Sequence, residues 1–387
     1  MKIAKSVNRL GTEAVYNIFA KTKKLIKEGK EVIDLSLGQS DFKSPQHAVD
    51  AAIKALKDGH HGYTLPNGII ECREAVSKKI KSLYKANIYP ERIIIMPGGK
   101  PTMNYAISFF GESGAEIIYP DPGFPIYESM INFTGAKAIP YDMTKNKDFS
   151  INPDTILSLI NEKTRLLILN NPHNPTGGFT EKHVIDKLAN GLKKFPDLAI
   201  LSDEVYDRLI FDEKEIPTLL NYPDLYDRLI VLNGWSKTYA MTGWRLGWSV
   251  WPEKLIEHVF KFCVNSHSCV NTPAQYGAIA ALNGPENHLN DMMKEFNLRR
   301  KLIVDGLRAL KGIECSIPGG SFFVFPNVKK TGMNGEEFTE KCLKEAGVAM
   351  IPGTSFGKCA MHNVRFNFAT SRENINKAIE KIDKILK

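Results

Sequence analysis

The chain has 387 residues, of which 43% are hydrophobic and 24% are charged, and its formal net charge is +8. This composition is ordinary for a soluble globular protein, and the length suffices for a sizeable core without disulfide or metal staples. Lysine and arginine are scattered along the chain rather than gathered in a tract, so the positive charge indicates a solvated surface and no nucleic-acid partner.

The cysteines and the N-terminal residues indicate the compartment. The 6 cysteines show no paired spacing and no C-x-x-C, which argues against a zinc site or a disulfide framework and fits a reducing compartment. The first residues, "MKIAKSVNRLGTEAVYNIF", lack the continuous apolar core of a signal peptide. No uncharged run approaches the length that a membrane span needs. We therefore expect a cytoplasmic protein.

Short apolar runs alternate with helical patterns over most of the chain. In chain order, strands are predicted at 92–96, 116–120, 164–170, 198–203, 228–233 and 245–251, and residues 181–195 are predicted to form one of the helices between them. Apolar strands that alternate with helices are typical of a mostly parallel sheet covered on both faces. The predicted fold class is α/β, with this sheet sandwiched by helices.

The pattern changes after "NGPENH" (283–288). An amphipathic helix is predicted over 290–311, followed by β-rich segments at 321–328 and 363–370 and a final helix over 372–386. This α+β pattern indicates a second, smaller domain.

The first residues are expected to join that smaller domain, because "EVIDLSLGQSDF" (31–42) is typical of a strand that leaves toward a loop. The chain then divides into a large domain of residues 46–285 and a small domain of residues 1–45 and 286–387. In such sheets, ligands bind at the loops beyond the carboxyl ends of the strands. The site is therefore expected at those loops.

The loop in "MPGGKPTMNYAISFF" (96–110) follows a predicted strand and opens a helix. Gly98 and Gly99 allow a tight turn and expose backbone N–H groups at a helix N-terminus, which is an anion site. An ordinary strand–helix turn would explain a lone Gly-Gly pair better. The segment is not a P-loop, because Pro101 follows Lys100 where that motif has Ser or Thr.

Two further loops carry polar residues at strand ends. In "NNPHNPTGG" (170–178), two Asn-Pro steps within five residues force a rigid loop, which a plain connection rarely needs. "SDEVYDRLIF" (202–211) places Asp203 and Tyr206 at a strand end. A buried acid there needs a positive partner, although a helix N-cap with acidic first-turn residues is the simpler explanation of this loop alone.

The segment "NGWSKTYAMTGWRLGW" (233–248) holds Lys237 and Arg245 among aromatic, small and hydroxyl residues, with no acid. A desolvated lysine has a lowered pKa and can form a Schiff base, and arginine suits a bidentate phosphate contact. In isolation, a lysine that reaches the surface and a structural arginine explain the segment equally well.

Together the groups at these strand ends match one ligand, pyridoxal 5′-phosphate (PLP). Gly99 and Arg245 suit its phosphate, and Lys237 suits its aldehyde. Asp203 suits its ring nitrogen, and Asn174 and Tyr206 suit its phenolic oxygen.

Seven motifs in one order resemble those of the class I/II aminotransferases of the fold type I PLP enzymes, and of the aspartate aminotransferase-like group in particular. They are "GYTLPNGIIECREAV" (62–76), "PGGK" (97–100), "YPDPGFPIY" (119–127), "NNPHNPTGG", "SDEVY" (202–206), "SKTYAMTGWRLGW" (236–248) and "VRFNFA" (364–369). Seven motifs in the family's order are far more specific than any one of them.

The resemblance implies a role for each matching residue. Lys237 holds the cofactor as a Schiff base and later moves the proton, Asp203 pairs with the protonated ring nitrogen, and Tyr206 hydrogen-bonds the ring oxygen. The implied cofactor-binding residues are Gly99, Lys100, Phe124, Asn174, Asp203, Tyr206, Lys237, Arg245 and, reaching in from the neighbouring subunit, Tyr63. The implied substrate-binding residues are Gly38, Lys100, Asn174 and Arg365, of which Arg365 holds the α-carboxylate.

The resemblance also implies a homodimer with shared active sites and ping-pong transfer between an L-amino acid and a 2-oxo acid. It implies cis peptide bonds before Pro122 and Pro175. One position departs from the family pattern, because many relatives have a phosphate-binding serine where this chain has Gly234. The serine here is Ser236, beside Lys237, and no direct bond from it to the phosphate is expected.

The expected donor is aspartate or another acidic amino acid, because relatives with the G-G-K form include enzymes that act on acidic amino acids. On this hypothesis Lys100 attracts the distal carboxylate; a lysine that only adds positive potential near the phosphate is an equal alternative. A donor such as alanine or an aromatic amino acid also stays open.

Three other classes of protein compete with an aminotransferase. A C–S lyase or a synthase on the same scaffold would use the same cofactor residues. A regulator without turnover is disfavoured, since only about 30 residues precede "EVIDLSLG", too few for a DNA-binding domain. A metal enzyme is disfavoured because His60 and His61 lack partners at ligand spacing.

Overall fold

The structure is a computed structural model that describes residues 1–11, 14–212 and 215–387. Its largest sheet has seven strands in the order β2-β8-β7-β6-β5-β3-β4. They are β2 (Ile93–Met96), β3 (Glu116–Asp121), β4 (Lys137–Asp142), β5 (Thr164–Asn170), β6 (Ala199–Asp203), β7 (Leu229–Gly234) and β8 (Gly247–Val250). Strands β3 to β7 pair in parallel, and β8 runs antiparallel to both β2 and β7. The predicted α/β class is confirmed.

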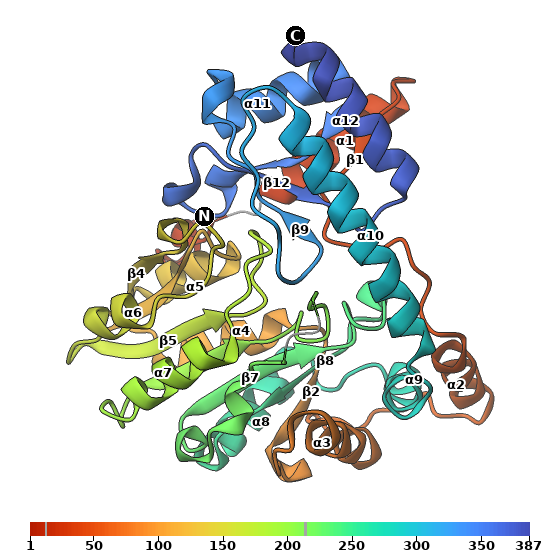
Figure 1. The fold of residues 1–387 in the computed structure, drawn as a ribbon. Coiled ribbons are helices and arrows are strands. Elements are labelled where there is room, and N and C mark those ends of the chain that lie inside the picture. Colours follow the sequence, from red (N-terminus) through yellow and green to blue (C-terminus); the bar gives the residue numbers. More distant parts are fainter. Residues whose placement is uncertain (12–13, 213–214) are drawn as a thin grey trace.

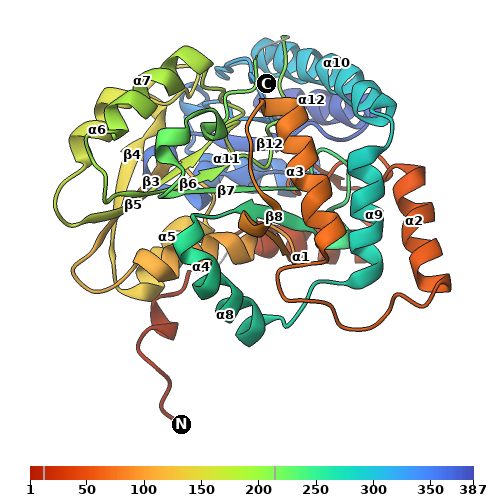
Figure 2. The same cartoon turned by 90° about the horizontal axis from the view of Figure 1, so that it is seen from below.

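Alternate strand residues pack against two different layers of helices. One core, which includes Ile93 and Ile95, is shared with α2 (Gln46–Lys57), α3 (Ile70–Tyr84), α6 (Pro153–Leu159), α7 (Lys182–Leu192) and α9 (Thr272–Asn283). The other, with Ile94 and Met96, is shared with α4 (Lys100–Phe110), α5 (Ile126–Thr134) and α8 (Ile256–Ser266). Figure 2 shows α4, α5 and α8 on one side of the strands and α6 and α7 on the other. The inner strands are predominantly apolar because both of their faces are covered.

All six predicted strands of this sheet are present, and the helix predicted over 181–195 is α7. Strand β4 was not predicted. Its sequence, "KAIPYD", contains Pro140 and has no continuous apolar run, and most of its residues are exposed or half-buried. Proline lacks a backbone donor and is tolerated in a strand at the sheet edge, which is where β4 lies.

The remaining strands form two small sheets. Strand β1 (Ile33–Asp34) pairs in parallel with β10 (Val348–Ala349), and β11 (Ile351–Pro352), β12 (Val364–Asn367) and β9 (Phe323–Val324) form an antiparallel sheet in that order. Around them lie α1 (Ala14–Lys27), α10 (Asn287–Ala309), α11 (Gly335–Lys341) and α12 (Arg372–Leu386). Helices α10 and α12 match the helices predicted over 290–311 and 372–386. Figure 1 shows α10 running from these small sheets down toward α9 and α2.

We propose the predicted division into residues 46–285 and residues 1–45 with 286–387. A separate apolar core joins β1, β9 and β12 to α10 and α12, which supports it. Tyr206, Leu209 and Phe211 extend into this core from the loop after β6. The carboxyl end of β6 therefore lies where the two parts of the molecule meet.

The structure also bears on the membrane. Across residues 1–11, 14–212 and 215–387, no helix combines the length and the apolar character that crossing a bilayer requires.

Candidate active site

A cleft of about 260 Å³ lies at the carboxyl ends of β5, β6 and β7, next to the N-terminus of α4. It is lined by Leu37, Gly38, Gln39, Gly99, Lys100, Met103, Phe124, Asn170, Asn174, Asp203, Val205, Tyr206, Leu232, Ser236, Lys237, Thr242 and Arg245. The structure thus brings together all the predicted cofactor residues except Tyr63. A larger hollow of about 540 Å³ between α1 and α11 is lined by apolar side chains together with lysine and glutamate, and it holds none of these residues.

Lys237 follows β7 and points into this cleft. Its Nζ donates a hydrogen bond to the carbonyl oxygen of Gly38 at 2.6 Å. Burial lowers the pKa of the Lys237 amine to about 8, and the nearby charges of Arg365 and Arg245 contribute to the lowering, against the attraction of Asp203. A lysine with this pKa is partly unprotonated at neutral pH, so it can act as a nucleophile and as a base.

Asp203 ends β6 and is only 2% exposed. Its Oδ2 accepts a hydrogen bond from the Tyr127 hydroxyl at 2.5 Å, and its Oδ1 accepts one from the Val205 backbone N–H at 3.3 Å. Burial raises the pKa of Asp203 to about 6, and these hydrogen bonds and Lys237 oppose that shift. Among the described residues no lysine or arginine forms an ion pair with this carboxylate, so the group lacks the compensating cation that a buried charge requires.

The turn before α4 forms an anion site with Arg245. Gly98 has a positive φ of 88°, and a Cβ on it would lie 2.3 Å from Nη2 of Arg245. The guanidinium therefore lies directly against the backbone that leads into the helix, and it is oriented by donating to the Thr242 carbonyl at 2.8 Å. Helix N–H groups and a guanidinium at one point are suited to a phosphate.

The strand end at Gly234 explains the departure from the family pattern. Gly234 pairs with Gly247 across β7 and β8, and a Cβ on Gly234 would come within 2.9 Å of the Gly247 Cα. A serine side chain has no room there. Ser236 lies two residues further on, in the lining of the cleft.

Asn174 and Tyr206 join Asp203 in the lining of the cleft. Asn174 is held by its backbone N–H, which donates to Oδ1 of Asn170 at 2.9 Å. Tyr206 is buried, its ring packs edge-on against Phe322, and burial raises the pKa of its hydroxyl above the ordinary range. A protonated phenol and a side-chain amide can both donate to an oxygen in the cleft.

Phe124 contributes its ring to the lining, and the ring centroid lies 5.6 Å from Nζ of Lys100.

The predicted cis peptide bonds before Pro122 and Pro175 are confirmed. A third precedes Pro172 and was not predicted.

Arg365 of β12 is buried behind the lining of the cleft, where it contacts the lining residue Asn174. Its Nη1 donates to Oδ1 of Asn174 at 3.0 Å and its Nη2 donates to the Ser36 carbonyl at 2.6 Å. The guanidinium carbon lies 4.3 Å from the centroid of the Phe323 ring and 4.7 Å from that of Phe356. Two aromatic rings thus fix the plane of the guanidinium, which suits it to bidentate binding of a carboxylate.

Tyr63 does not reach the cleft of its own chain. Its side chain is 94% exposed, and its predicted contact with the phosphate of a neighbouring subunit stays a prediction.

Sequence reasoning missed several contributors, namely Leu37, Gln39, Tyr127, Phe323 and Phe356. Of these, Tyr127 stood at the end of the motif "YPDPGFPIY", so the motif contained a signal for it.

Comparison with known proteins agrees with this geometry. The model of the family described as aminotransferase class I and II matches residues 30–382. The chain is 35% identical to the aspartate aminotransferase of Pyrococcus abyssi and 33% identical to aromatic-amino-acid aminotransferase 2 of Thermococcus litoralis, in each case over 92% of both chains. Its structure matches that of the aspartate aminotransferase from Thermus thermophilus with maleate, with a TM-score of 0.93, 29% identity and coverage of 100% of both chains.

The buried Asp203 predicts an unusual stability profile for the cofactor-free protein. Folding raises its pKa from an ordinary 3.8 to about 6, so the folded state loses stability as the pH rises through this range. Asp203→Asn removes that cost. Urea unfolding should show the cofactor-free variant to be up to about 3 kcal/mol more stable than the wild type near pH 8, since a tenfold change in proton affinity corresponds to about 1.4 kcal/mol. Near pH 3 the two should be about equal, and a variant that is less stable at every pH would contradict this account of the carboxylate.

Proposed function

The chain belongs to the class I and II aminotransferases, and we propose that it uses PLP to transfer the amino group of an acidic L-amino acid, aspartate first of all, to a 2-oxo acid. The main support for PLP as the cofactor is that one cleft contains both Lys237, whose pKa is lowered, and Asp203, a buried carboxylate without an ion-pair partner. A protonated pyridine ring supplies that cation.

The other residues of the cleft fit the rest of PLP. The N-terminus of α4 with Arg245 suits the phosphate, and Asn174 with Tyr206 suits the ring oxygen. Phe124 offers an aromatic ring for stacking. When bound, PLP supplies an electrophilic aldehyde carbon and a ring that takes up the electron pair left on Cα as its proton departs.

The protein's own residues then position charge and protons. Asp203, held by Tyr127, would hold the ring nitrogen in its protonated form. Arg365 binds the α-carboxylate between two aromatic rings and so orients the amino acid. Lys237, partly unprotonated near neutral pH, would be the base that takes the proton from Cα and delivers it to the former aldehyde carbon of the cofactor. The 2-oxo acid product leaves before the second 2-oxo acid binds in the same place, which gives ping-pong kinetics.

Lys100 supports an acidic donor. It opens α4 and lines the cleft, so its ammonium adds a positive charge there besides that of Arg365, which contacts the lining residue Asn174. An amino acid with two carboxylates can engage both cations, and an aromatic donor can engage one. The aspartate aminotransferases among the relatives favour the same assignment.

We further propose a cytoplasmic homodimer. Tyr63 supports it, because this residue is 94% exposed, does not line the cleft of its own chain and is available for contact with a second subunit.

The first test removes the lysine. Lys237→Ala should fold and still bind PLP, because the phosphate and ring contacts remain, but transamination should be lost. Borohydride reduction followed by peptide mass spectrometry should attach PLP to Lys237 in the wild type and to no lysine in the variant. The control Lys100→Ala should still be labelled at Lys237. Labelling of another lysine in the wild type would refute the assignment.

The second test concerns the donor. Lys100→Ala should lower kcat/KM for aspartate about tenfold to a hundredfold, since a partly desolvated charge pair contributes roughly 1.5–3 kcal/mol. Values for alanine and phenylalanine should stay nearly unchanged. Lys100→Arg, which keeps the charge, should retain most of the preference. Equal losses for all donors would mean that Lys100 serves the phosphate and not the substrate.

The third test concerns the dimer. Neither Lys237→Ala nor Tyr63→Ala should be active alone at low PLP concentration. If Tyr63 acts across the interface, a hybrid dimer of the two variants has one intact cleft and one doubly damaged cleft. Mixing and refolding the two variants should therefore restore activity. Failure to regain activity in a verified hybrid would show that Tyr63 acts within its own chain or not at all.

A further inference from the structure

Residues 37–42, "LGQSDF", form a strap that leads from β1 toward α2 and crosses the cleft. Leu37, Gly38 and Gln39 line the cleft, and the Gly38 carbonyl accepts the hydrogen bond from Lys237. The strap is irregular backbone outside any strand, and the Asp41 backbone N–H donates to the Ala369 carbonyl at 3.2 Å. Side-chain contacts add to this backbone bond in fixing the position of the strap.

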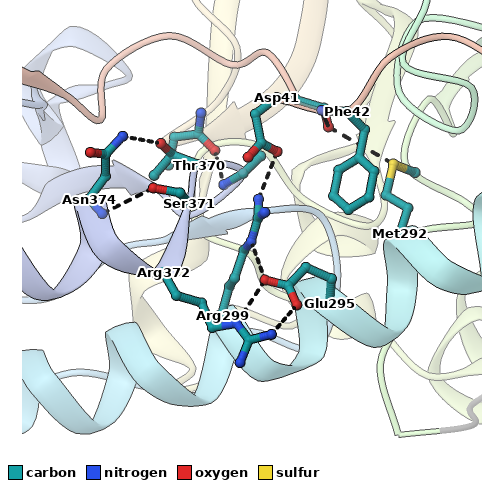
Figure 3. Close-up of polar contacts among 12 residues, drawn as sticks. Asp41, Phe42, Met292, Glu295, Arg299, Thr370, Ser371, Arg372 and Asn374 are labelled. Atoms are coloured by element: carbon teal, nitrogen blue, oxygen red, sulfur yellow. Dashed lines mark hydrogen bonds and ion pairs between the residues drawn. The ribbon is translucent and has the colours of Figure 1, made fainter.

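The outer half of the strap docks on one face of α10. Asp41 accepts a hydrogen bond from Nη1 of Arg299 at 2.7 Å, and the Phe42 ring lies 5.3 Å from the same guanidinium carbon. The Phe42 ring also packs edge-on against Phe296, and the Ser40 hydroxyl lies 4.0 Å from the Met292 sulfur. Figure 3 shows the Asp41 carboxylate meeting Arg299 and the Phe42 ring beside Met292. Three consecutive strap residues thus engage helix positions about one turn apart.

Arg299 is held in place independently of the strap. Its Nε donates to Glu295 one turn earlier in the same helix at 2.9 Å, so the guanidinium is oriented from within α10 and does not depend on Arg372, which binds Glu295 separately from α12 at 2.8 Å. The Arg299 side chain is 8% exposed, whereas that of Asp41 is 37% exposed. The strap therefore docks on a prepositioned guanidinium (Figure 3).

The inner half of the strap is tied to the strand that carries Arg365. The side-chain amide of Asn367, two residues along β12, donates to the Leu37 carbonyl and, at 3.4 Å, to the Gln39 carbonyl. Gly38 itself lies against Phe323, because a Cβ on it would be 3.0 Å from that ring. Phe323 is one of the two rings that sandwich Arg365. The strap therefore contacts Lys237 directly through Gly38, and it contacts Arg365 through the Phe323 ring.

We propose that Asp41 and Arg299 are positioning residues for the substrate: their ion pair fixes the strap so that Gly38 and Arg365 together present the binding site for the α-carboxylate. The proposal rests on the proposed function. It concerns the amino acid and not the cofactor, because the Asp41 and Arg299 side chains contact each other, Phe42 and residues of α10, and none of these contacts involves the α4 turn, Asp203 or Phe124. Loss of the pair should therefore weaken substrate binding and leave PLP binding unchanged.

The test uses the PLP-loaded enzyme and two variants from the same cluster. Asp41→Ala removes the contact between strap and helix, and Arg372→Met removes an ion pair to Glu295 without touching the strap; both side chains are partly exposed. The dissociation constant of an amino donor is measured from the absorbance change of bound PLP, with aspartate, glutamate, alanine and phenylalanine tried in turn. For the donor with the highest rate of transamination, Asp41→Ala should raise both the dissociation constant and KM about tenfold, since small displacements of a positioned substrate group are costly. Its kcat and PLP affinity should stay near wild type, and Arg372→Met should match the wild type throughout.

A second measurement is independent of turnover. Amide hydrogen exchange of the peptide containing residues 37–42 should be faster in Asp41→Ala than in the wild type and unchanged in Arg372→Met. Adding Arg299→Lys to Asp41→Ala should produce little further loss of donor affinity, because the two residues act through one contact.

The outcomes separate the possible failures. If no donor changes the absorbance of the wild type, the proposed function is wrong. If donors react with the wild type and Asp41→Ala binds them equally well, the positioning role is wrong, even where exchange is faster. Equal losses of affinity in Asp41→Ala and Arg372→Met would also overturn it, since the cluster would then serve general stability.

Discussion

A buried carboxylate without a cation is the constraint on which the rest of the site depends. Asp203 ends a strand that is covered on both faces, and burial raises its pKa to about 6. Tyr127 and the Val205 backbone hold it by hydrogen bonds, which orient the carboxylate without neutralising it. The protein retains an electrostatic cost that a cationic ligand can relieve, and costs of this kind are typical of functional sites.

The two parts of the molecule contribute different ends of the site. The strand ends of the large sheet supply Asp203, Lys237 and the anion site at Arg245, which suit a cofactor. Strand β12 and the strap at residues 37–42 supply the groups suited to an amino acid carboxylate. Because Lys237 donates to the strap, the reactive amine lies between these two sets of residues.

Much of this could be predicted from local sequence. The buried strands are apolar runs, and each predicted cofactor residue of the large sheet stands in a motif that follows one of them. Their position in the sequence therefore brought them to one edge of the sheet. Strand β4 was not predicted, because an edge strand that contains Pro140 lacks a continuous apolar run. Contacts between distant segments were not predicted either, because tertiary packing sets them and no local pattern encodes them. They are the contact of Tyr127 with Asp203, the two rings around Arg365, and the contact of Arg299 with Asp41.

The protonation state of the ligand's ring tests the central claim most directly. The measurement is the ¹⁵N chemical shift of PLP labelled at the ring nitrogen and bound to the wild-type protein, followed by NMR from about pH 6 to about pH 9. If Asp203 is the carboxylate that requires a cation, the nitrogen should stay protonated over this whole range, well above the pKa of about 6 that the protein alone holds for Asp203. A ring nitrogen that is unprotonated throughout would contradict the account.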